Sequence, residues 1–413
     1  MMAPSRLVLL ALVCAPMLAS PMRAQQEPPL DFKAVAEGPA RTDFRWKTQL
    51  IGPRLTFQQR FLVQVRANVT VPGGDRAHDF YFLVKVADEA GHWLKGNDHN
   101  HYSVPANLAG ENEVQYTCGL YLRPGKYGVT IVAYDGSGKE FDVAHKALEV
   151  RGLKKDKLPE IDRDLATVEF VSDVPSDSME EHAWPTHDDT WTLAHGREWL
   201  PVRNIVPVQI DVVLNLSNWM DPRLRGRNSV RLFRQRLGRA MQVGSVLSHL
   251  DLAHGCIRIS AVDIAPSRVL YDRSDASSFD WTKAEQAISP SDQEVVDVSA
   301  LEHRKEAAMF FRRFLSHVLY DSGGCTGATG TARKVLIVVG GSYVFPAGAH
   351  VSGAWPEKPC DCRYYYLRTD DYPIDDDIDG LMKHVTKRRN HMQDGSKFRD
   401  ALAQLIADLE SGG

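Results

Sequence analysis

The sequence has no strong excess of charge of either sign, few cysteines and no long apolar run beyond its first residues. Its 413 residues carry a formal net charge of -4 and include 6 cysteines. A nucleic-acid-binding protein needs a positive excess to displace counterions from phosphates, so we expect no nucleic acid as partner. No segment after residue 24 is apolar enough to predict a transmembrane helix.

Motifs of familiar enzyme and cofactor sites are also missing. The sequence has no G-x-S-x-G nucleophile elbow. The Gly-rich stretch GGCTGATGTARK follows a helical pattern and precedes a strand, which reverses the order that a phosphate-binding loop requires. No nucleophile stands in a pattern with a base and an orienting acid. These absences predict a non-enzymatic protein with no cofactor.

The N-terminus has the layout of a secretory signal peptide. Arg6 supplies positive charge, residues 7–18 are mostly apolar, and small residues precede a predicted cleavage near Ala24. We therefore expect residues 1–24 to be removed and the mature chain to be exported, either periplasmic or secreted.

Five cysteines remain in the mature chain, and export would place them in an oxidising compartment. Cys360 and Cys362 are too close in sequence for a redox C-x-x-C motif. The preferred disulfide joins Cys325 to one of these two. Cys118 and Cys256 lie inside apolar runs, where a free thiol packs as a small core residue.

Patterning divides the mature chain into four segments. Residues 25–51 read as a leader of low order, and residues 152–204 as a connector. Between them, residues 52–151 alternate apolar and polar side chains, as in RFLVQVRANVTV, with turn residues between the runs. This period of two predicts antiparallel strands and a β-sandwich domain of immunoglobulin or fibronectin type.

Residues 205–413 alternate apolar strands with amphipathic helices. Predicted strands are IVPVQIDVVLNL, CIRISAVDI, KVLIVVGG and CRYYYLR, and predicted helices include residues 228–250 and 397–409. Nearly unbroken apolar strands separated by helices are typical of parallel sheets covered on both faces. The predicted fold class is therefore α/β: a doubly wound, mostly parallel sheet of Rossmann type, preceded by an all-β sandwich.

On these features, residues 205–411 resemble a von Willebrand factor A-type domain. The features that carry the resemblance are the strands VQIDVVLNLSNWM and IRISAVDI, the passage RKVLIVVGG and the final helix SKFRDALAQLIADL. The whole chain is similar to exported, VWFA-related proteins of acidobacteria, in which a β-rich region with a stretch like PGKYGVTIVAYD precedes the A-type domain. The resemblance implies a role in protein–protein contact.

The resemblance also implies a metal site, but the expected ligands are largely missing. The family pattern D-x-S-x-S reads Asn215, Ser217 and Trp219 here, and Gly340 and Gly341 stand where a later Asp is expected. Neutral donors in place of carboxylates hold a divalent ion weakly. The sequence therefore predicts a degenerate site without a working metal.

Two weaker metal candidates have simpler explanations. Ser299 could offer a loop hydroxyl, but it also fits the start of a helix as a capping residue. Asp375, Asp377 and Asp379 have the spacing of a calcium loop without its final Glu, and acidic residues also suit the first turn of a helix. Histidines at 99 and 101 lie in a polar stretch predicted as a loop.

Interface candidates cluster around the same strand end. Trp219 and Met220 are residue types found in interface cores, although Trp219 could instead fold inward and fill the empty ion site. Seven arginines lie between residues 223 and 239, including Arg227, Arg231 and Arg234. They form either a solvated helix face or a docking surface for an acidic partner or lipid headgroups.

The predicted function is thus an exported interaction or scaffold protein that binds an unknown protein partner without a metal; an acidic partner is one alternative that the arginine cluster leaves open. Two alternatives remain open. One is a metal-dependent adhesion module that binds Mg²⁺ or Ca²⁺ at a remodelled site, and the other is an unrecognised hydrolase.

Overall fold

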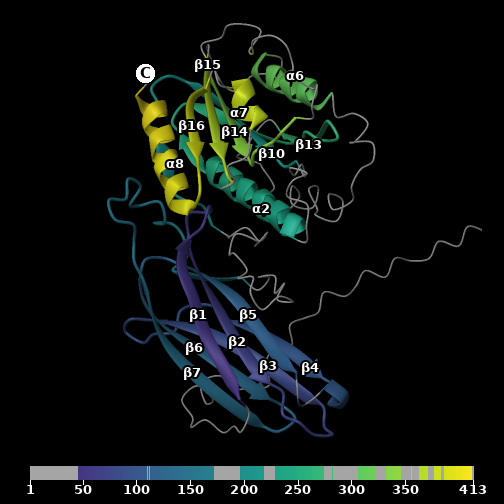
Figure 1. Ribbon diagram of the computed structural model, residues 1–413. Coiled ribbons are helices and arrows are strands. Elements are labelled where there is room, and N and C mark those ends of the chain that lie inside the picture. The colour runs from purple at the N-terminus through teal and green to yellow at the C-terminus, as the bar shows by residue number, and fades with distance from the viewer. Residues whose placement is uncertain are drawn as a thin grey trace, which may run out of the picture.

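The computed structural model describes residues 45–108, 110, 112–171, 196–217, 228–273, 281, 306–320, 332–345, 355, 362–370, 376–382 and 386–411. Figure 1 shows two parts, a set of long strands below and a second sheet with helices above. The predicted signal peptide, the leader up to residue 44 and residues 172–195 of the connector lie outside the described residues.

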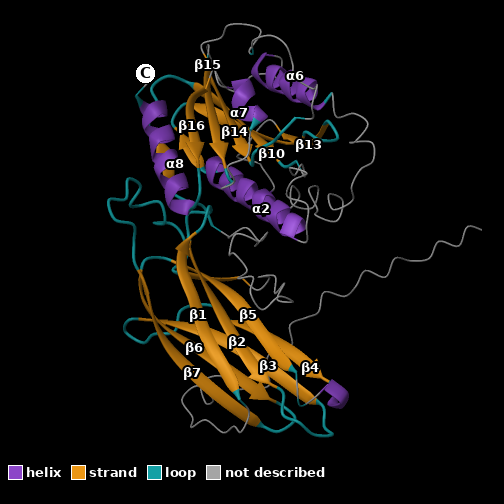
Figure 2. Ribbon diagram, viewed as in Figure 1, coloured by secondary structure: helices purple, strands orange, loops and turns teal. Residues whose placement is uncertain are grey.

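The lower part is a β-sandwich of two four-stranded antiparallel sheets, in the orders β1-β2-β5-β8 and β4-β3-β6-β7 (Figure 2). The strands are β1 (Trp46–Leu55), β2 (Phe61–Thr70), β3 (His78–Asp88), β4 (Asp98–Val104), β5 (Glu113–Leu122), β6 (Gly125–Asp135), β7 (Glu140–Val150) and β8 (Val168–Val171). One short helical turn, η1 (Ala106–Leu108), follows β4. The alternating apolar side chains of the two sheets face each other and form one core, as the period of two predicts.

The upper part contains a six-stranded mixed sheet in the order β13-β12-β10-β14-β15-β16. Its strands are β10 (Val208–Asn215), β12 (Gly255–Asp263), β13 (Arg268–Arg273), β14 (Arg333–Gly340), β15 (Cys362–Arg368) and β16 (Thr386–His391). β13 turns back antiparallel against β12, and the other neighbours run parallel. A separate short pair joins β9 (Leu200–Val202) and β11 (Leu250–Leu252).

Four α-helices are described: α2 (Asn228–Ser248), α6 (Ala307–Tyr320), α7 (Asp377–Met382) and α8 (Gly395–Glu410). Apolar residues of α2 and α8 share a core with β10 and β12. Apolar residues of α6 and α7 share another with β14 and β15. No described helix is both long enough and apolar enough to span a bilayer.

The predicted fold class, α/β with a doubly wound, mostly parallel sheet, is wrong. Strand accounts for 47% of the structure and helix for 21%, and the arrangement is mostly antiparallel and sandwich-like. Seven of the twelve strand pairs within the described ranges are antiparallel. The physical reason is that the sandwich supplies six of these seven antiparallel pairs, while β13 supplies the seventh by folding back on β12 as a hairpin instead of crossing over through a helix.

The turn between β1 and β2 connects the two parts. Residues 56–60 are all buried, although they lie at the tip of a hairpin. Phe57 belongs to the core of the upper sheet and packs on Phe398 of α8, with ring centroids 6.2 Å apart. Gln59 Nε2 donates to the carbonyl of Gly395 at 3.1 Å. The sandwich hairpin is therefore part of the core of the other sheet.

The cysteines differ in part from the prediction. Cys362 is disulfide-bonded, in line with its selection as a candidate, while Cys325 and Cys360 lie outside the described residues. Cys118 is a buried free thiol, as predicted. Cys256 is disulfide-bonded, so its interpretation as a free core thiol was wrong.

Candidate binding rim at the carboxyl ends of the mixed sheet

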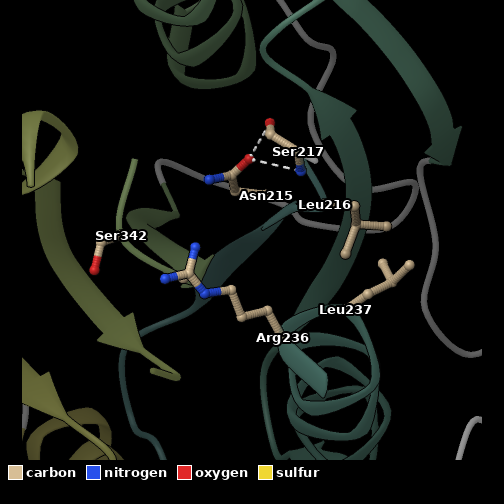
Figure 3. A pocket seen from close by; sticks show the side chains of 7 residues that line it. Asn215, Leu216, Ser217, Arg236, Leu237 and Ser342 are labelled. Atoms are coloured by element: carbon tan, nitrogen blue, oxygen red, sulfur yellow. Dashed lines mark hydrogen bonds between the residues drawn. The ribbon is translucent and has the colours of Figure 1, made fainter. Parts of the chain in front are cut away.

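The candidate site lies where β10, β14 and β15 end, beside α2. We call Asn215, Ser217, Arg236, Ser342 and Asp370 the polar rim. Parallel strands bring their carboxyl ends to one edge of a sheet, which is where α/β-type sheets place ligand sites. Four of these residues line one small pocket, drawn in Figure 3, together with Leu216, Leu237 and Gly341.

The two metal-site residues predicted at the end of β10, Asn215 and Ser217, lie close together, but their polar atoms are hydrogen-bonded to each other. Asn215 is 6% exposed, and its Oδ1 accepts hydrogen bonds from both the backbone N–H and the hydroxyl of Ser217. The Ser217 hydroxyl oxygen in turn accepts from the N–H of Ile264, at 2.7 Å, next to the end of β12. These contacts tie β10 to β12 and occupy the oxygens that a cation would need.

Two glycines at the end of β14 create the space for the rest of the rim. A Cβ atom on Gly340 would lie 2.8 Å from both the Cβ and the carbonyl oxygen of Asn215, so no side chain fits there. A Cβ on Gly341 would lie 3.0 Å from Arg236 Cδ and 3.2 Å from Asp370 Oδ2. The acid that the family pattern places after this strand is therefore sterically excluded.

An ion pair occupies this space instead. Arg236 Nη2 lies 3.0 Å from Asp370 Oδ2, and Arg368 Nε donates to Asp370 Oδ1 at 2.6 Å. Ser342 donates to Asp370 from its backbone N–H at 2.7 Å and also from its hydroxyl. The Asp370 side chain is 2% exposed, so its charge is balanced by these neighbours and not by solvent.

Electrostatics at Asp370 favour the charged carboxylate. Burial raises its pKa, but Arg236, Arg368 and Ser342 together outweigh burial and hold the pKa below its ordinary value. A carboxylate already held by two guanidinium groups and a serine is a poor ligand for a further cation. The rim residues therefore do not fit the divalent ion that the family resemblance implies.

The calcium interpretation of the acidic segment is not supported by the geometry. Asp377 Oδ2 accepts from the N–H of Phe345 at 2.6 Å and stands in the first turn of α7, as the helix-start alternative predicts. Asp379 also lies in that first turn, and Asp375 is outside the described residues. The described residues contain no group of three or more His, Cys, Asp or Glu side chains that could hold a metal ion.

Asp376, which the sequence did not single out, has the most perturbed carboxyl of the segment. Burial raises its pKa to about 6, although a hydrogen bond from the Tyr366 hydroxyl, at 2.7 Å, acts in the opposite direction. Its oxygens also accept from the N–H groups of Tyr343 and Ile378. This carboxyl links β15 to the start of α7.

Other predicted residues lie partly beyond what the structure describes. Trp219, Met220, Arg227 and Ser299 are outside the described residues. Arg231 and Arg234 lie on α2, with only their backbone described. Two further arginines of that helix do not form a solvated face: Arg236 enters the rim, and Arg239 is 7% exposed beneath it.

Sequence reasoning missed Arg236 and Asp370 as a pair. Arg236 was one of seven clustered arginines, and nothing in the sequence distinguished it from its neighbours. Asp370 follows an apolar strand directly, and that position was the available signal, because polar residues after parallel strands meet at one edge. The histidines at 99 and 101 were also misplaced, since both lie on strand β4 and not in a loop.

Comparison with known proteins does not assign the chain to a family. No family model matches it, and no curated protein does. Among solved structures, the ApaA protein from Bordetella pertussis is 13% identical, with 27% of this chain and 98% of that chain covered and a TM-score of 0.19. The C-terminal domain of wzt is 12% identical, with 29% of this chain and 86% of that domain covered and a TM-score of 0.18.

A third similar structure is a calcium-binding mutant of β-glucuronidase 2 from Bacteroides uniformis. It is 9% identical, covers 71% of this chain and 33% of that chain, and has a TM-score of 0.20. With TM-scores this low, none of the three structures supports a statement about the function of this chain. The resemblance to A-type domains stays a prediction.

Proposed function

We propose that this protein is an exported, non-enzymatic binding or scaffold protein whose polar rim contacts a protein partner without a bridging metal ion. The observation that carries the proposal is the ion pair between Arg236 and Asp370. It places a fixed cation of the protein itself at the strand ends where the A-type resemblance implies a divalent ion. Recognition at this rim then depends on shape and hydrogen bonding.

The size of the pocket supports a binding role over catalysis at the rim. Its cavity volume is about 10 Å³, which is room for about one water molecule. Sites for small-molecule substrates have volumes of several hundred Å³. A partner would therefore rest on the rim and would not enter it.

The resemblance also supports export and protein contact, because A-type domains generally act in protein–protein contact. The rim is positioned by rigid elements: β10, β14 and β15 fix its floor, and α2 fixes Arg236. Rigid, pre-positioned groups lower the entropy lost on binding. This arrangement suits a surface that binds without rearranging.

The test is a pull-down in which the mature chain is the bait for its own envelope fraction, with and without EDTA. Baits are the unmodified chain, Arg236→Gln at the rim and, as matched control, Arg151→Gln. Arg151 lies on the sandwich with a side chain 81% exposed. Thermal unfolding of each bait checks that it is folded.

We expect one partner to be retained in EDTA, retained by the Arg151 variant and lost by the Arg236 variant. Loss of that partner in EDTA would favour the metal-dependent alternative and contradict the proposal. Equal retention by both arginine variants would show that the partner binds elsewhere.

A further inference from the structure

A second cavity lies along α6, beside the turn that joins β12 to β13 in the upper part of the molecule (Figure 1). Its volume is about 590 Å³, within the range of several hundred Å³ that is typical of small-molecule sites. Ser267 of the turn lines it on one side. The other lining residues belong to α6 or directly precede it: Glu306, Met309, Phe310, Arg313, Phe314 and His317. The cavity shares no residue with the pocket at the polar rim.

The cavity follows one stripe of α6. Its lining residues recur at spacings of three and four, which places them on one side of a helix. The adjoining stripe is buried in the core of the mixed sheet and consists of Ala307, Ala308, Phe311, Leu315, Val318 and Leu319. Met309, on the cavity side, is 42% exposed. The helix therefore buries one side in the core and presents a partly apolar second side at the surface.

The middle of the cavity is apolar and held in place by the core. Phe314 is 7% exposed and belongs to the core of the mixed sheet, and Phe310 packs against that core. The two rings have centroids 6.3 Å apart and planes 24° apart. A ligand would meet rings that are already ordered, which reduces the entropic cost of binding. Met309 adds a flexible thioether side chain that adapts to apolar groups of different shape.

Charged side chains of opposite sign lie toward the two ends of this apolar stretch. Glu306 and Arg313 are both exposed, and neither forms an ion pair within the described part of the chain. Seven residues of helix separate them by about 10 Å along the axis, and His317 lies one turn beyond Arg313. Arg268 of the adjacent strand β13 lies 3.9 Å from Asp263, so its charge is balanced there. The cavity is therefore dipolar, with an acid at one end and a cation at the other.

We propose that this cavity binds a short apolar peptide with free termini, about three residues long. Three extended residues span about 10 Å, so the ammonium of such a peptide reaches Glu306 while its carboxylate reaches Arg313. Its apolar side chains then lie against the phenylalanine rings and Met309. A fatty acid satisfies the arginine but brings its tail to a carboxylate, and a neutral sugar uses neither charge. The dipolar ends and the apolar middle together select the peptide.

The test is calorimetric titration of the full chain with the tripeptide Leu-Leu-Leu. Four further ligands are its N-acetylated form, its C-terminal amide, the form blocked at both ends, and dodecanoate. The variants are Glu306→Gln, Arg313→Gln and Met309→Ala, each at an exposed position. Arg151→Gln is the matched control, because Arg151 lies on the sandwich with a side chain 81% exposed. Thermal unfolding of each variant checks that it is folded.

We expect the unblocked tripeptide to bind with a Kd of about 10–100 µM, which is within the limit for a ligand of its size. Glu306→Gln should weaken that binding about threefold, as expected for an exposed ion pair, and should leave the affinity for the N-acetylated peptide unchanged. Arg313→Gln should do the same for the unblocked peptide and spare the C-terminal amide. Met309→Ala should weaken all peptides alike, and Arg151→Gln should bind like the unmodified chain.

Three outcomes would overturn the proposal. One is the absence of tripeptide binding tighter than about 1 mM. Another is equal affinity for the unblocked peptide and the form blocked at both ends, which would show that the charged ends are not recognised; this comparison needs no variant. The third is tighter binding of dodecanoate than of the tripeptide, which would assign the cavity to an anionic amphiphile. None of these outcomes bears on the rim, because the two sites have no residue in common.

Discussion

Replacing Phe57 by Ala should separate the stability of the two parts of the chain. Phe57 is 1% exposed at the tip of the β1–β2 hairpin, yet its ring belongs to the core of the mixed sheet. It packs on Phe398, and the guanidinium of Arg239 lies 5.3 Å from its ring centroid. Arg239 also donates to the carbonyl of Thr369 at 3.0 Å, so the ring supports the strand end next to the rim.

The expected loss follows from the size of the cavity that the change leaves. Truncating a buried Phe to Ala costs about 3–5 kcal/mol, a large share of the roughly 5–15 kcal/mol that stabilises a typical domain. For a domain of this size that corresponds to a fall in Tm of about 6–20 °C. The loss should fall on the mixed sheet, since the ring packs there.

The assay is urea unfolding followed by tryptophan fluorescence and far-UV circular dichroism. We expect one cooperative transition for the unmodified chain and two for Phe57→Ala, with the sandwich unfolding last. Trp93→Ala, which removes an exposed ring, should change the free energy of unfolding by no more than about 1 kcal/mol. A Phe57→Ala variant that unfolds in a single transition, with a free energy of unfolding within about 1 kcal/mol of the unmodified chain, would refute the reasoning.

A second variant tests the same contact from the other side. A Cβ atom on Gly395 would lie 2.4 Å from the carbonyl oxygen of Thr56 and 2.5 Å from that of Leu55. Because both neighbours are backbone atoms, they have little freedom to move away. Gly395→Ala should therefore also yield two transitions, and an unchanged single transition would contradict the buried position of the hairpin.

Three further predictions concern titration, disulfides and the rim. Burial raises the pKa of Asp376 from 3.8 to about 6, so between these pH values its carboxyl is protonated in the folded state and charged in the unfolded state. The folded state therefore loses stability relative to the unfolded state as the pH rises through 6. Asp376→Asn should then gain up to about 3 kcal/mol over the unmodified chain between pH 4 and 7 in urea melts, and a constant difference would contradict it. Non-reducing peptide mapping should find Cys256 and Cys362 in separate disulfides. Strands β10 and β14 lie between β12, which carries Cys256, and β15, which carries Cys362, and this places the two cysteines about 14 Å apart, too far for one disulfide. A peptide that joins the two would refute this prediction. Arg236→Gln should lower the free energy of unfolding by about 3 kcal/mol in the same melts, because the buried Asp370 carboxylate keeps only the Arg368 guanidinium as a partner. A decrease below about 1 kcal/mol would contradict a stabilising ion pair.

Much of the secondary structure could be predicted from the sequence, because apolar periodicity dominates there. β10 and β14 are mostly apolar runs, and α8 has an apolar face at helical spacing. β16 reads TKRRNH, with no apolar alternation, so its strand conformation depends on pairing with β15, which a local pattern does not encode. β13 reads RVLYDR and was not predicted, and its antiparallel return is part of why the predicted fold class was wrong.

The candidate site could be predicted only in part. Asn215 and Ser217 were found because they follow a recognisable strand. The pair of Arg236 and Asp370 was not found, because it depends on which helix face meets which strand end.

The central claim is that the polar rim works without a divalent ion, and calorimetric titration of the full chain with Mg²⁺, Mn²⁺ and Ca²⁺ tests it most directly. With Asp370 held by Arg236 and Arg368, we expect no binding tighter than about millimolar for any of the three ions. Stoichiometric binding at micromolar concentration that Ser217→Ala abolishes would contradict the claim.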